Sequence, residues 1–153
     1  MQDIAIYLLK GLGALKFGAT ADEAVTVFGK PEETEELTDE LMGEKSTAYH
    51  YWDKGFSLFF KDDEHKTFSC AEVDDGDILL FGKKVFELNE QQITDLFKDN
   101  GYKLTETEMH SWGEKRLSFD DAFADLYFEK GKLISINFCA SDYPVTEMKL
   151  NLN

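Results

Sequence analysis

Proline is scarce in this chain, and tracts of low complexity are missing from it. The two prolines are Pro31 and Pro144, and no stretch is rich in Gly and Ser or repeats one residue. Because flexible linkers between domains usually have such compositions, the sequence offers no candidate linker. Its 153 residues match the size of one domain with its own core. We therefore expect a single domain over residues 1–153.

Cysteines and long apolar runs are equally limited. The two cysteines, Cys70 and Cys139, show neither a CxxC pair nor the spacing of a metal site. The first residues lack a basic start and a small-residue cleavage site, and no apolar segment approaches the length of a membrane span. These observations predict a cytoplasmic protein without a signal peptide and with both thiols reduced.

Basic residues number 16 against 31 acidic ones, which gives a formal net charge of -15. A field of this sign repels nucleic-acid phosphates and anionic membranes, so we expect neither as a partner. It attracts basic proteins, although an acidic surface that only maintains solubility explains the same composition. The 14% aromatic content, with 13 phenylalanines, favours sheet over a helix bundle.

The segment from Phe17 to Pro31 is the clearest helix signal in the sequence. Thr20 is a good N-cap, and Glu23 three residues later completes a capping box. Gly29 and Pro31 end the helix, because glycine accepts the left-handed conformation and proline cannot continue the hydrogen-bond ladder. The pattern predicts a short helix that packs one apolar face on a sheet.

This helix signal returns in the second half of the chain, where Asn89 and Gln92 form the equivalent capping box. Six residues recur 69 positions later: Gly13, Phe17, Thr20, Ala24, Val27 and Phe28 correspond to Gly82, Phe86, Asn89, Ile93, Leu96 and Phe97. We therefore expect an α+β fold made of two tandem helix-plus-antiparallel-sheet repeats. They would form one continuous sheet with the helices on one face. The predicted repeats span about residues 11–78 and 79–142, followed by a tail at 143–153.

Strands are expected wherever apolar and aromatic residues alternate between turn signals. An additional short helix is predicted from Ile4 to Lys10, with a strand as the weaker alternative. The acidic stretch from Glu32 to Glu44 reads as a solvated edge strand and a loop. The other predicted strands are Tyr49–Trp52, Phe56–Phe60, Phe68–Cys70, Ile78–Phe81, Tyr102–Glu108, Arg116–Phe119, Phe123–Phe128 and Leu133–Phe138. Alternation places Cys70 on the core side with Phe68.

The first helix opening resembles that of two bacterial groups. The pattern Phe17-Gly18-x-Thr20-x-x-Glu23-Ala24-Val25, followed by Gly29-x-Pro31, is similar to that of the SmpA/OmlA outer-membrane assembly lipoproteins and of the related β-lactamase inhibitor protein. The segment from Lys10 to Gly18 is also similar to the start of small cytoplasmic proteins, some of which look like immunity proteins beside toxin genes. The resemblance implies a two-repeat scaffold whose exposed sheet face binds a protein. Because the matched residues are caps and core, it carries fold information and no site residues.

Two His-x-Trp triplets are the main candidates for chemistry: His50 with Trp52, and His110 with Trp112. Each histidine is a candidate metal ligand or acid–base group, and the alternative is a half-exposed strand residue. The triplets fall outside the 69-residue register, and no HxH or HExxH motif accompanies them. We therefore expect no metal, no cofactor and no catalytic residues, with an enzyme site between the repeats as the minor hypothesis.

Strand alternation instead predicts a binding surface on the sheet face opposite the helices. Aromatic side chains within a rim of carboxylates are typical of protein-binding surfaces. An alternative is that another part of the chain or a second subunit covers these aromatics. The predicted protein-binding residues are His50, Trp52, Phe59, Trp112, Asp120, Asp125, Tyr127, Glu35, Glu36, Asp39 and Glu40.

From these observations we expect a non-enzymatic, acidic protein-binding module. The favoured hypothesis is an immunity protein that neutralises a basic toxin domain, with carboxylates steering the encounter and aromatic side chains holding the complex. The alternative is a structural or assembly module that homodimerises, or binds a peptide, through its exposed sheet face.

Overall fold

The computed structural model describes residues 4–38, 45–74 and 76–141, which form two α-helices and two β-sheets. The helices are α1 (Ala21–Phe28) and α2 (Glu90–Asp99). The large sheet contains β4 (Glu33–Thr38), β5 (Lys45–Tyr51), β6 (Phe56–Lys61), β7 (Phe68–Val73), β10 (Glu106–Met109), β11 (Glu114–Phe119), β12 (Ala124–Glu129) and β13 (Lys132–Cys139). The small sheet contains β1 (Ala5–Tyr7), β2 (Gly11–Leu12), β3 (Leu15–Lys16), β8 (Leu79–Leu80) and β9 (Lys83–Lys84). The predicted α+β class is confirmed.

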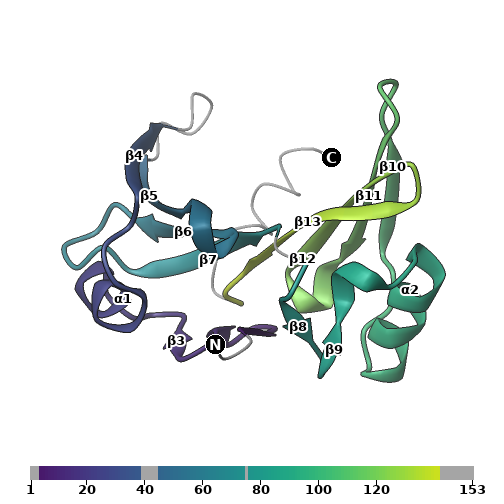
Figure 1. Cartoon of the computed structure of the whole chain (residues 1–153), viewed down its shortest axis with the longest axis horizontal. Coiled ribbons are helices and arrows are strands. Elements are labelled where there is room, and N and C mark those ends of the chain that lie inside the picture. Colours follow the sequence, from purple (N-terminus) through teal and green to yellow (C-terminus); the bar gives the residue numbers. More distant parts are fainter. Residues whose placement is uncertain (1–3, 39–44, 75, 142–153) are drawn as a thin grey trace.

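The large sheet is antiparallel throughout, with the strand order β10-β11-β12-β13-β7-β6-β5-β4. Strands β4–β7 and β10–β13 are each consecutive in the chain, and the two groups meet where β7 pairs with β13. The predicted acidic edge strand is β4, and β10 is the edge at the other end. Figure 1 shows both α-helices and the small sheet on one side of this sheet, while its two end hairpins rise on the other side.

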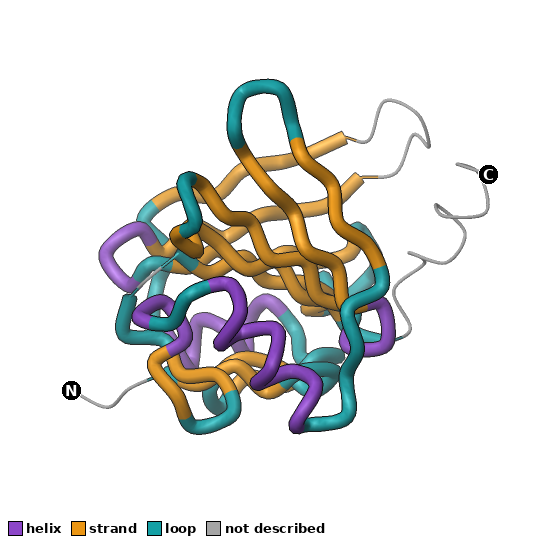
Figure 2. The backbone as a smooth tube through the Cα atoms, turned by 90° about the vertical axis from the view of Figure 1, so that its right-hand side faces the viewer, coloured by secondary structure: helices purple, strands orange, loops and turns teal. Residues whose placement is uncertain are grey.

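The small sheet corrects two expectations. The strands do not form one continuous sheet, because β1 pairs with β2 and, in parallel, with β8 in a separate five-stranded sheet. The predicted helix from Ile4 to Lys10 is also wrong: β1 occupies this segment, with Ile6 buried and Tyr7 exposed. The pairing with β8 was invisible to a local pattern, since it joins segments more than 70 residues apart. Figure 2 shows the short strands with the helices beneath the large sheet.

Both predicted helix caps are confirmed. Thr20 Oγ1 accepts a hydrogen bond from the Glu23 backbone N–H at 3.1 Å, and Glu23 Oε1 accepts one from the Thr20 N–H at 3.2 Å. Asn89 and Gln92 repeat this exchange at 2.9 Å in both directions. At the start of each helix, the N–H groups of the N-cap and of N3 therefore bond to side chains only three residues away.

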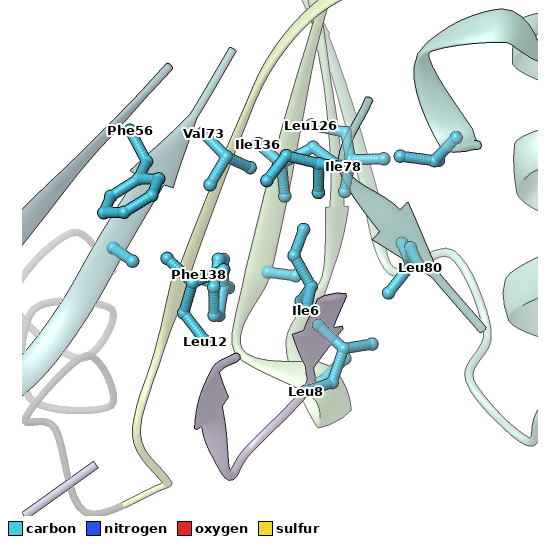
Figure 3. Close-up of a cluster of buried hydrophobic side chains, with 14 of the residues drawn as sticks. Ile6, Leu8, Leu12, Phe56, Val73, Ile78, Leu80, Leu126, Ile136 and Phe138 are labelled. Carbon is cyan, nitrogen blue, oxygen red and sulfur yellow. The ribbon is translucent and has the colours of Figure 1, made fainter. Parts of the chain in front are cut away.

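One apolar core lies between the large sheet, the small sheet and the helices. Figure 3 shows Phe56, Ile136 and Phe138 of the large sheet and Ile6 and Leu80 of the small sheet within one cluster of buried side chains. Each helix places an aromatic ring or alanines onto this core, and the two most closely packed rings, Phe97 and Phe119, stack with centroids 4.0 Å apart. Both helices pack on the core side of the large sheet, so they leave its opposite face uncovered. We call that opposite side the outer face.

Two β-bulges decide which side chains reach the outer face. The register shifts between Phe59 and Phe60, so that Ser69 is an extra residue in β7, and again between Tyr127 and Phe128. A single extra residue reverses the alternation of the strand. Cys70 was expected on the core side with Phe68, and that expectation is wrong, because the bulge turns it to the outer face.

Candidate functional site

The outer face carries one continuous row of polar residues, one from each of the eight strands. Strand pairing places these residues directly opposite one another across the whole sheet, from one edge to the other. We call them the polar row: Glu33, His50, Ser57, Glu72, Asn137, Asp125, Ser118 and Glu106. The neighbouring row on the core side is mostly apolar: Tyr49, Leu58, Ala71, Phe138, Ala124 and Phe119. A period of two residues therefore separates a polar surface from the core in the six inner strands, whereas the edge strands β4 and β10 are exposed along most of their length.

At the β4 end, a hydrogen-bonded chain links Ser57, His50 and Glu35. His50 is only 8% exposed, and its Nε2 lies 3.0 Å from Glu35 Oε1. Its Nδ1 lies 2.7 Å from Ser57 Oγ. Because an ionised carboxylate only accepts hydrogen bonds, Nε2–H is the donor to Glu35, and in the neutral ring the Ser57 hydroxyl donates to Nδ1. The chain fixes the orientation of the imidazole ring.

Trp52 covers this histidine. The two rings are stacked with centroids 4.3 Å apart and an angle of 7° between their planes. The indole Nε1–H donates to Glu33 Oε1 at 3.2 Å, and the side chain remains 55% exposed. Trp52 lies at the start of a 3-10 turn, Trp52–Lys54, which replaces the last residue of the predicted strand. Its ring is therefore held in place on one side and open to solvent.

At the β10 end, Arg116 is surrounded by carboxylates. Its guanidinium donates to Glu106 Oε1 at 2.6 Å and to Glu108 Oε2 at 3.0 Å. It also donates to Ser118 Oγ at 2.6 Å, and Ser118 in turn donates to Asp125 Oδ1 at 2.6 Å. One positive charge thus faces three carboxylates, so the local net charge stays negative.

A second histidine–tryptophan stack stands at the same end. The rings of His110 and Trp112 are 4.4 Å apart at 5°. His110 Nε2 lies 3.1 Å from Glu108 Oε1, so this histidine, like His50, is held by a glutamate. Trp112 is 70% exposed and its neighbour in the hairpin, Met109, is 67% exposed. The two His-x-Trp triplets therefore form two similar stacks, although they come from different positions in their hairpins.

A cavity of about 400 Å³ lies beside the β10 end of the polar row. Its lining is dominated by acceptors, among them Asp125 and Glu106, and Arg116 is its sole basic side chain. The complete lining is Glu106, Arg116, Ser118, Asp120, Asp121, Phe123, Ala124, Asp125, Asn137 and Cys139. Such a surface favours hydrogen-bond donors and cations over anions.

The electrostatics of the outer face are visible in two shifted groups. The pKa of Glu72, at the centre of the polar row, is raised by partial burial and by the nearby Asp74, while His50 opposes the shift. Although Glu72 is exposed by surface area, strands on both sides displace much of the surrounding water. The pKa of Tyr127 is raised by burial and then by Asp125. Both shifts reflect negative charge gathered on a partly dehydrated surface.

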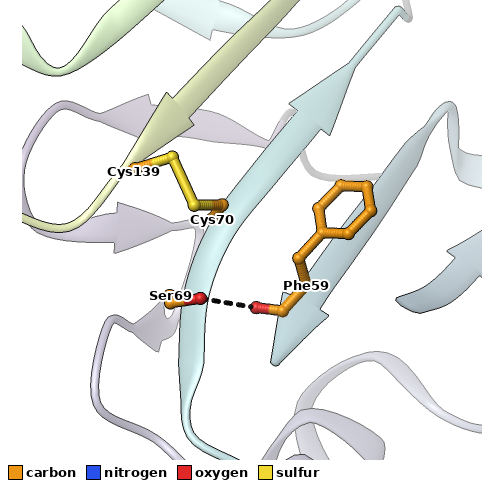
Figure 4. The surroundings of a disulfide bond; sticks show 4 residues. All are labelled: Phe59, Ser69, Cys70 and Cys139. Carbon is orange, nitrogen blue, oxygen red and sulfur yellow. Dashed lines mark hydrogen bonds between the residues drawn. A yellow bond between two sulfur atoms is a disulfide. The ribbon is translucent and has the colours of Figure 1, made fainter. Parts of the chain in front are cut away.

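A disulfide joins the two groups of strands on this face. Figure 4 shows Cys70 of β7 bonded to Cys139 of β13, with Phe59 on the next strand. The two cysteines are direct partners in the β7–β13 ladder. The expectation of two reduced thiols is therefore corrected: the bulge at Ser69 turns Cys70 toward the same face as Cys139, where the two sulfur atoms meet.

The predicted binding residues separate into distinct groups. His50, Trp52 and Glu35 come together at one end of the sheet, while Asp120 and Asp125 line the cavity at the other. Trp112 lies in the turn of the β10–β11 hairpin, at the opposite end of β11 from Asp120. Tyr127 lies opposite Arg116 on β12, and Phe59 is half-buried opposite Cys70. Glu36, also named as a binding residue, pairs with Thr47 and lies on the other side of β4 from Glu35. Asp39 and Glu40 lie outside the described residues.

Several members of the site were not predicted, among them Arg116, Glu33, Glu72 and Glu106. The signal that identifies them is the pairing register, since each is polar at a position opposite another polar residue. Local alternation finds the outward residues of one strand, but it does not align one strand with the next. The stacking inside each His-x-Trp triplet was also missed, because residues i and i+2 share a face only where the strand geometry persists.

The chain of Ser57, His50 and Glu35 has the residue types of a nucleophilic triad, but its geometry favours a structural role. Ser57 is 7% exposed and lies within β6, which pairs on both sides. Its neighbouring backbone N–H groups belong to those ladders, so they are not available to stabilise an oxyanion. Within residues 4–38, 45–74 and 76–141, no group of three or more His, Cys, Asp or Glu residues is arranged to hold a metal ion.

No helix in the described part of the chain has the length and apolar character that crossing a bilayer requires. In comparisons with models of protein families, with curated proteins and with solved structures, nothing matched this chain.

Proposed function

We propose that this protein binds a basic protein through the outer face of its large sheet. The observation that carries the proposal is the polar row, which presents carboxylates from one edge of the sheet to the other, while the neighbouring Arg116 is already surrounded by carboxylates. The net charge of -15 adds a long-range field that accelerates encounter with a basic partner. A toxin domain neutralised by an immunity protein is the partner class that the sequence favours.

The shape and composition of the face support this proposal. In Figure 1 the end strands β4–β5 and β10–β11 rise on either side of the central strands. The two ends carry the exposed Trp52 and Trp112, which are residue types enriched in the energetic centres of interfaces. Acidic steering and aromatic contact are thus offered by the same surface.

The proposal also includes the origin of this scaffold, which we infer to be two tandem repeats. Support comes from the capping boxes at Thr20 and Asn89, and from the two bulges between the last strand pairs of each group. The disulfide also joins positions separated by 69 residues, the same spacing as the helix signals.

The cellular compartment of the protein can be tested through the state of its two cysteines. The sequence predicts a cytoplasmic protein, whereas a disulfide is typical of oxidising compartments. Mass spectrometry of protein alkylated before and after reduction measures the thiol state directly. Two alkylated cysteines in freshly lysed cells would favour the cytoplasm, and unmodified, disulfide-bonded cysteines would exclude a reduced steady state.

The direct test measures the binding of deca-lysine, a basic probe, through NMR amide shifts of the protein at about 20 mM and 300 mM salt. We expect saturable shifts along the polar row and an affinity that falls steeply with salt. Glu33→Gln with Glu106→Gln should weaken binding more than the control pair Asp22→Asn with Asp99→Asn, which changes the same charge on the helices. Equal weakening, with shifts spread over the helices, would show nonspecific attraction and overturn the proposal.

The alternative function is self-assembly, and the exposed edges β4 and β10 are the observation that favours it. Both edges carry glutamates, which oppose pairing with a second acidic copy. Light scattering across a range of protein concentrations separates the two functions. A dimer at every concentration would favour assembly, whereas a monomer would favour the basic partner.

A further inference from the structure

We propose that the two histidine–tryptophan stacks are subsites for arginine side chains of the basic partner. This inference rests on the proposed function and specifies how the partner is recognised. It starts from a duplication that repeat symmetry does not require: the same ring pair is built twice, once at each end of the outer face, from triplets 60 residues apart.

The two stacks share three features. In each, the indole and imidazole planes are nearly parallel, at 7° and 5°, so the histidine covers one face of the tryptophan. In each, the histidine Nε2 is held by a glutamate oxygen, at 3.0 Å from Glu35 and 3.1 Å from Glu108. In each, the tryptophan remains largely exposed, at 55% and 70%. The uncovered side of each indole is therefore presented to solvent in a fixed orientation.

Fixing an aromatic ring before binding lowers the entropy cost of using it as a contact. Trp52 is fixed twice, because its Nε1–H also donates to Glu33 Oε1 at 3.2 Å. Most exposed side chains instead lose rotamer freedom when a partner arrives. The glutamate–histidine–tryptophan arrangement thus serves as a rigid support for a flat ligand group.

The charge around each indole selects a cation. Glu33 and Glu35 lie beside the His50–Trp52 stack, and Glu108, whose other carboxylate oxygen binds Arg116, lies beside the His110–Trp112 stack. A cation over an indole face gains from the ring quadrupole and from nearby carboxylates together. A guanidinium group is planar, weakly hydrated and able to stack while donating to carboxylates at its edge. An ammonium group satisfies the charge requirement but cannot stack, so the geometry favours arginine over lysine.

The test compares deca-arginine with deca-lysine, which have equal charge and length, by tryptophan fluorescence at low salt. Trp52→Phe and Trp112→Phe each leave a single tryptophan, so each stack is observed separately. We expect deca-arginine to bind the wild-type protein several-fold more tightly than deca-lysine. Trp52→Ala and Trp112→Ala should each reduce that preference about two- to five-fold, and the phenylalanine variants less.

His50→Gln and His110→Gln test the support rather than the ring. Each should reduce the preference for deca-arginine while leaving the affinity for deca-lysine nearly unchanged, because the charge of the face is preserved. Circular dichroism establishes that every variant is folded before its binding is compared.

The outcomes separate this inference from the proposed function. Equal affinities for the two peptides, unaffected by both alanine variants, would overturn the arginine subsites while leaving a basic-protein surface in place. Failure of both peptides to bind at about 20 mM salt would overturn the proposed function as well. A preference for arginine that survives both alanine variants would assign recognition to another part of the surface and contradict the inference.

Discussion

Glu72 is the residue at which the charge of the outer face has its clearest energetic consequence. It stands between Ser57 and Asn137 in the polar row, and partial burial, then Asp74, raise its pKa. A carboxyl group with a raised pKa binds its proton more tightly in the folded protein than in the unfolded chain. Stability therefore falls as pH rises from the ordinary pKa of glutamate through the higher folded value, and the penalty persists at neutral pH.

Replacement of Glu72 by Gln removes this penalty. We expect Glu72→Gln to stabilise the protein at pH 7 by under about 1 kcal/mol, since solvent screens a partly exposed charge. The gain should vanish below the ordinary pKa of glutamate, where the wild-type side chain is protonated in both states. Urea unfolding at pH 4 and pH 7 measures this difference, with Glu36→Gln on the opposite side of β4 as the control. A gain that is equal at both pH values would point to packing instead of charge.

At the scale of the secondary-structure element, the stability of the two α-helices depends on their N-caps. Each is short, and short helices in water gain little from propensity alone. Thr20→Ala and Asn89→Ala each remove the acceptor for an N3 backbone N–H, and each should cost about 1 kcal/mol. Thr20→Ser, which keeps the hydroxyl, should recover most of the loss in chemical denaturation. An alanine variant as stable as the wild type would mean that packing alone holds the helix.

The caps also mark the limit of what the sequence predicts about single elements. A capping box is encoded within four residues, so Thr20 with Glu23 was readable without any tertiary information. The bulge at Ser69 was not, because an extra residue in β7 exists only relative to β6. Because of that one extra residue, Cys70 lies on the face opposite to the expected one, and its disulfide with Cys139 was not predicted. The strand segments could be predicted, but which of their side chains face the core after a bulge could not.

At the scale of the whole molecule, the candidate site also divides into features that local sequence predicts and features that long-range strand pairing decides. The acidic charge and the outward residues His50, Trp52 and Asp125 followed from composition and alternation. The polar row did not, because it depends on seven strand pairings, one of which joins β7 to β13 across the molecule. The small sheet was missed for the same reason, since β1 and β8 are short and pair only in the folded chain. Long-range pairing, more than local propensity, organises this protein.

The disulfide acts at this scale, because it closes a loop of 69 residues across the β7–β13 joint. Closing a loop of this length restricts the unfolded chain, and by the chain-entropy relation it contributes about 4 kcal/mol at most, with 2–4 kcal/mol typical. We expect the double variant Cys70→Ser with Cys139→Ser to lose about this much stability in urea. The reduced wild-type protein should unfold at nearly the same urea concentration, since both lack the same cross-link.

Hydrogen exchange would show where that stability resides. The β7–β13 ladder has four residue pairs, Val73–Ile136 to Cys70–Cys139, whereas β5 and β6 share six. Reduction should therefore lower amide protection more at β7–β13 than within the β5–β6 hairpin. If the core from both sheets and both helices holds the joint by itself, protection will fall equally everywhere. That result would make the disulfide a general constraint on the unfolded chain instead of a local support for the centre of the polar row.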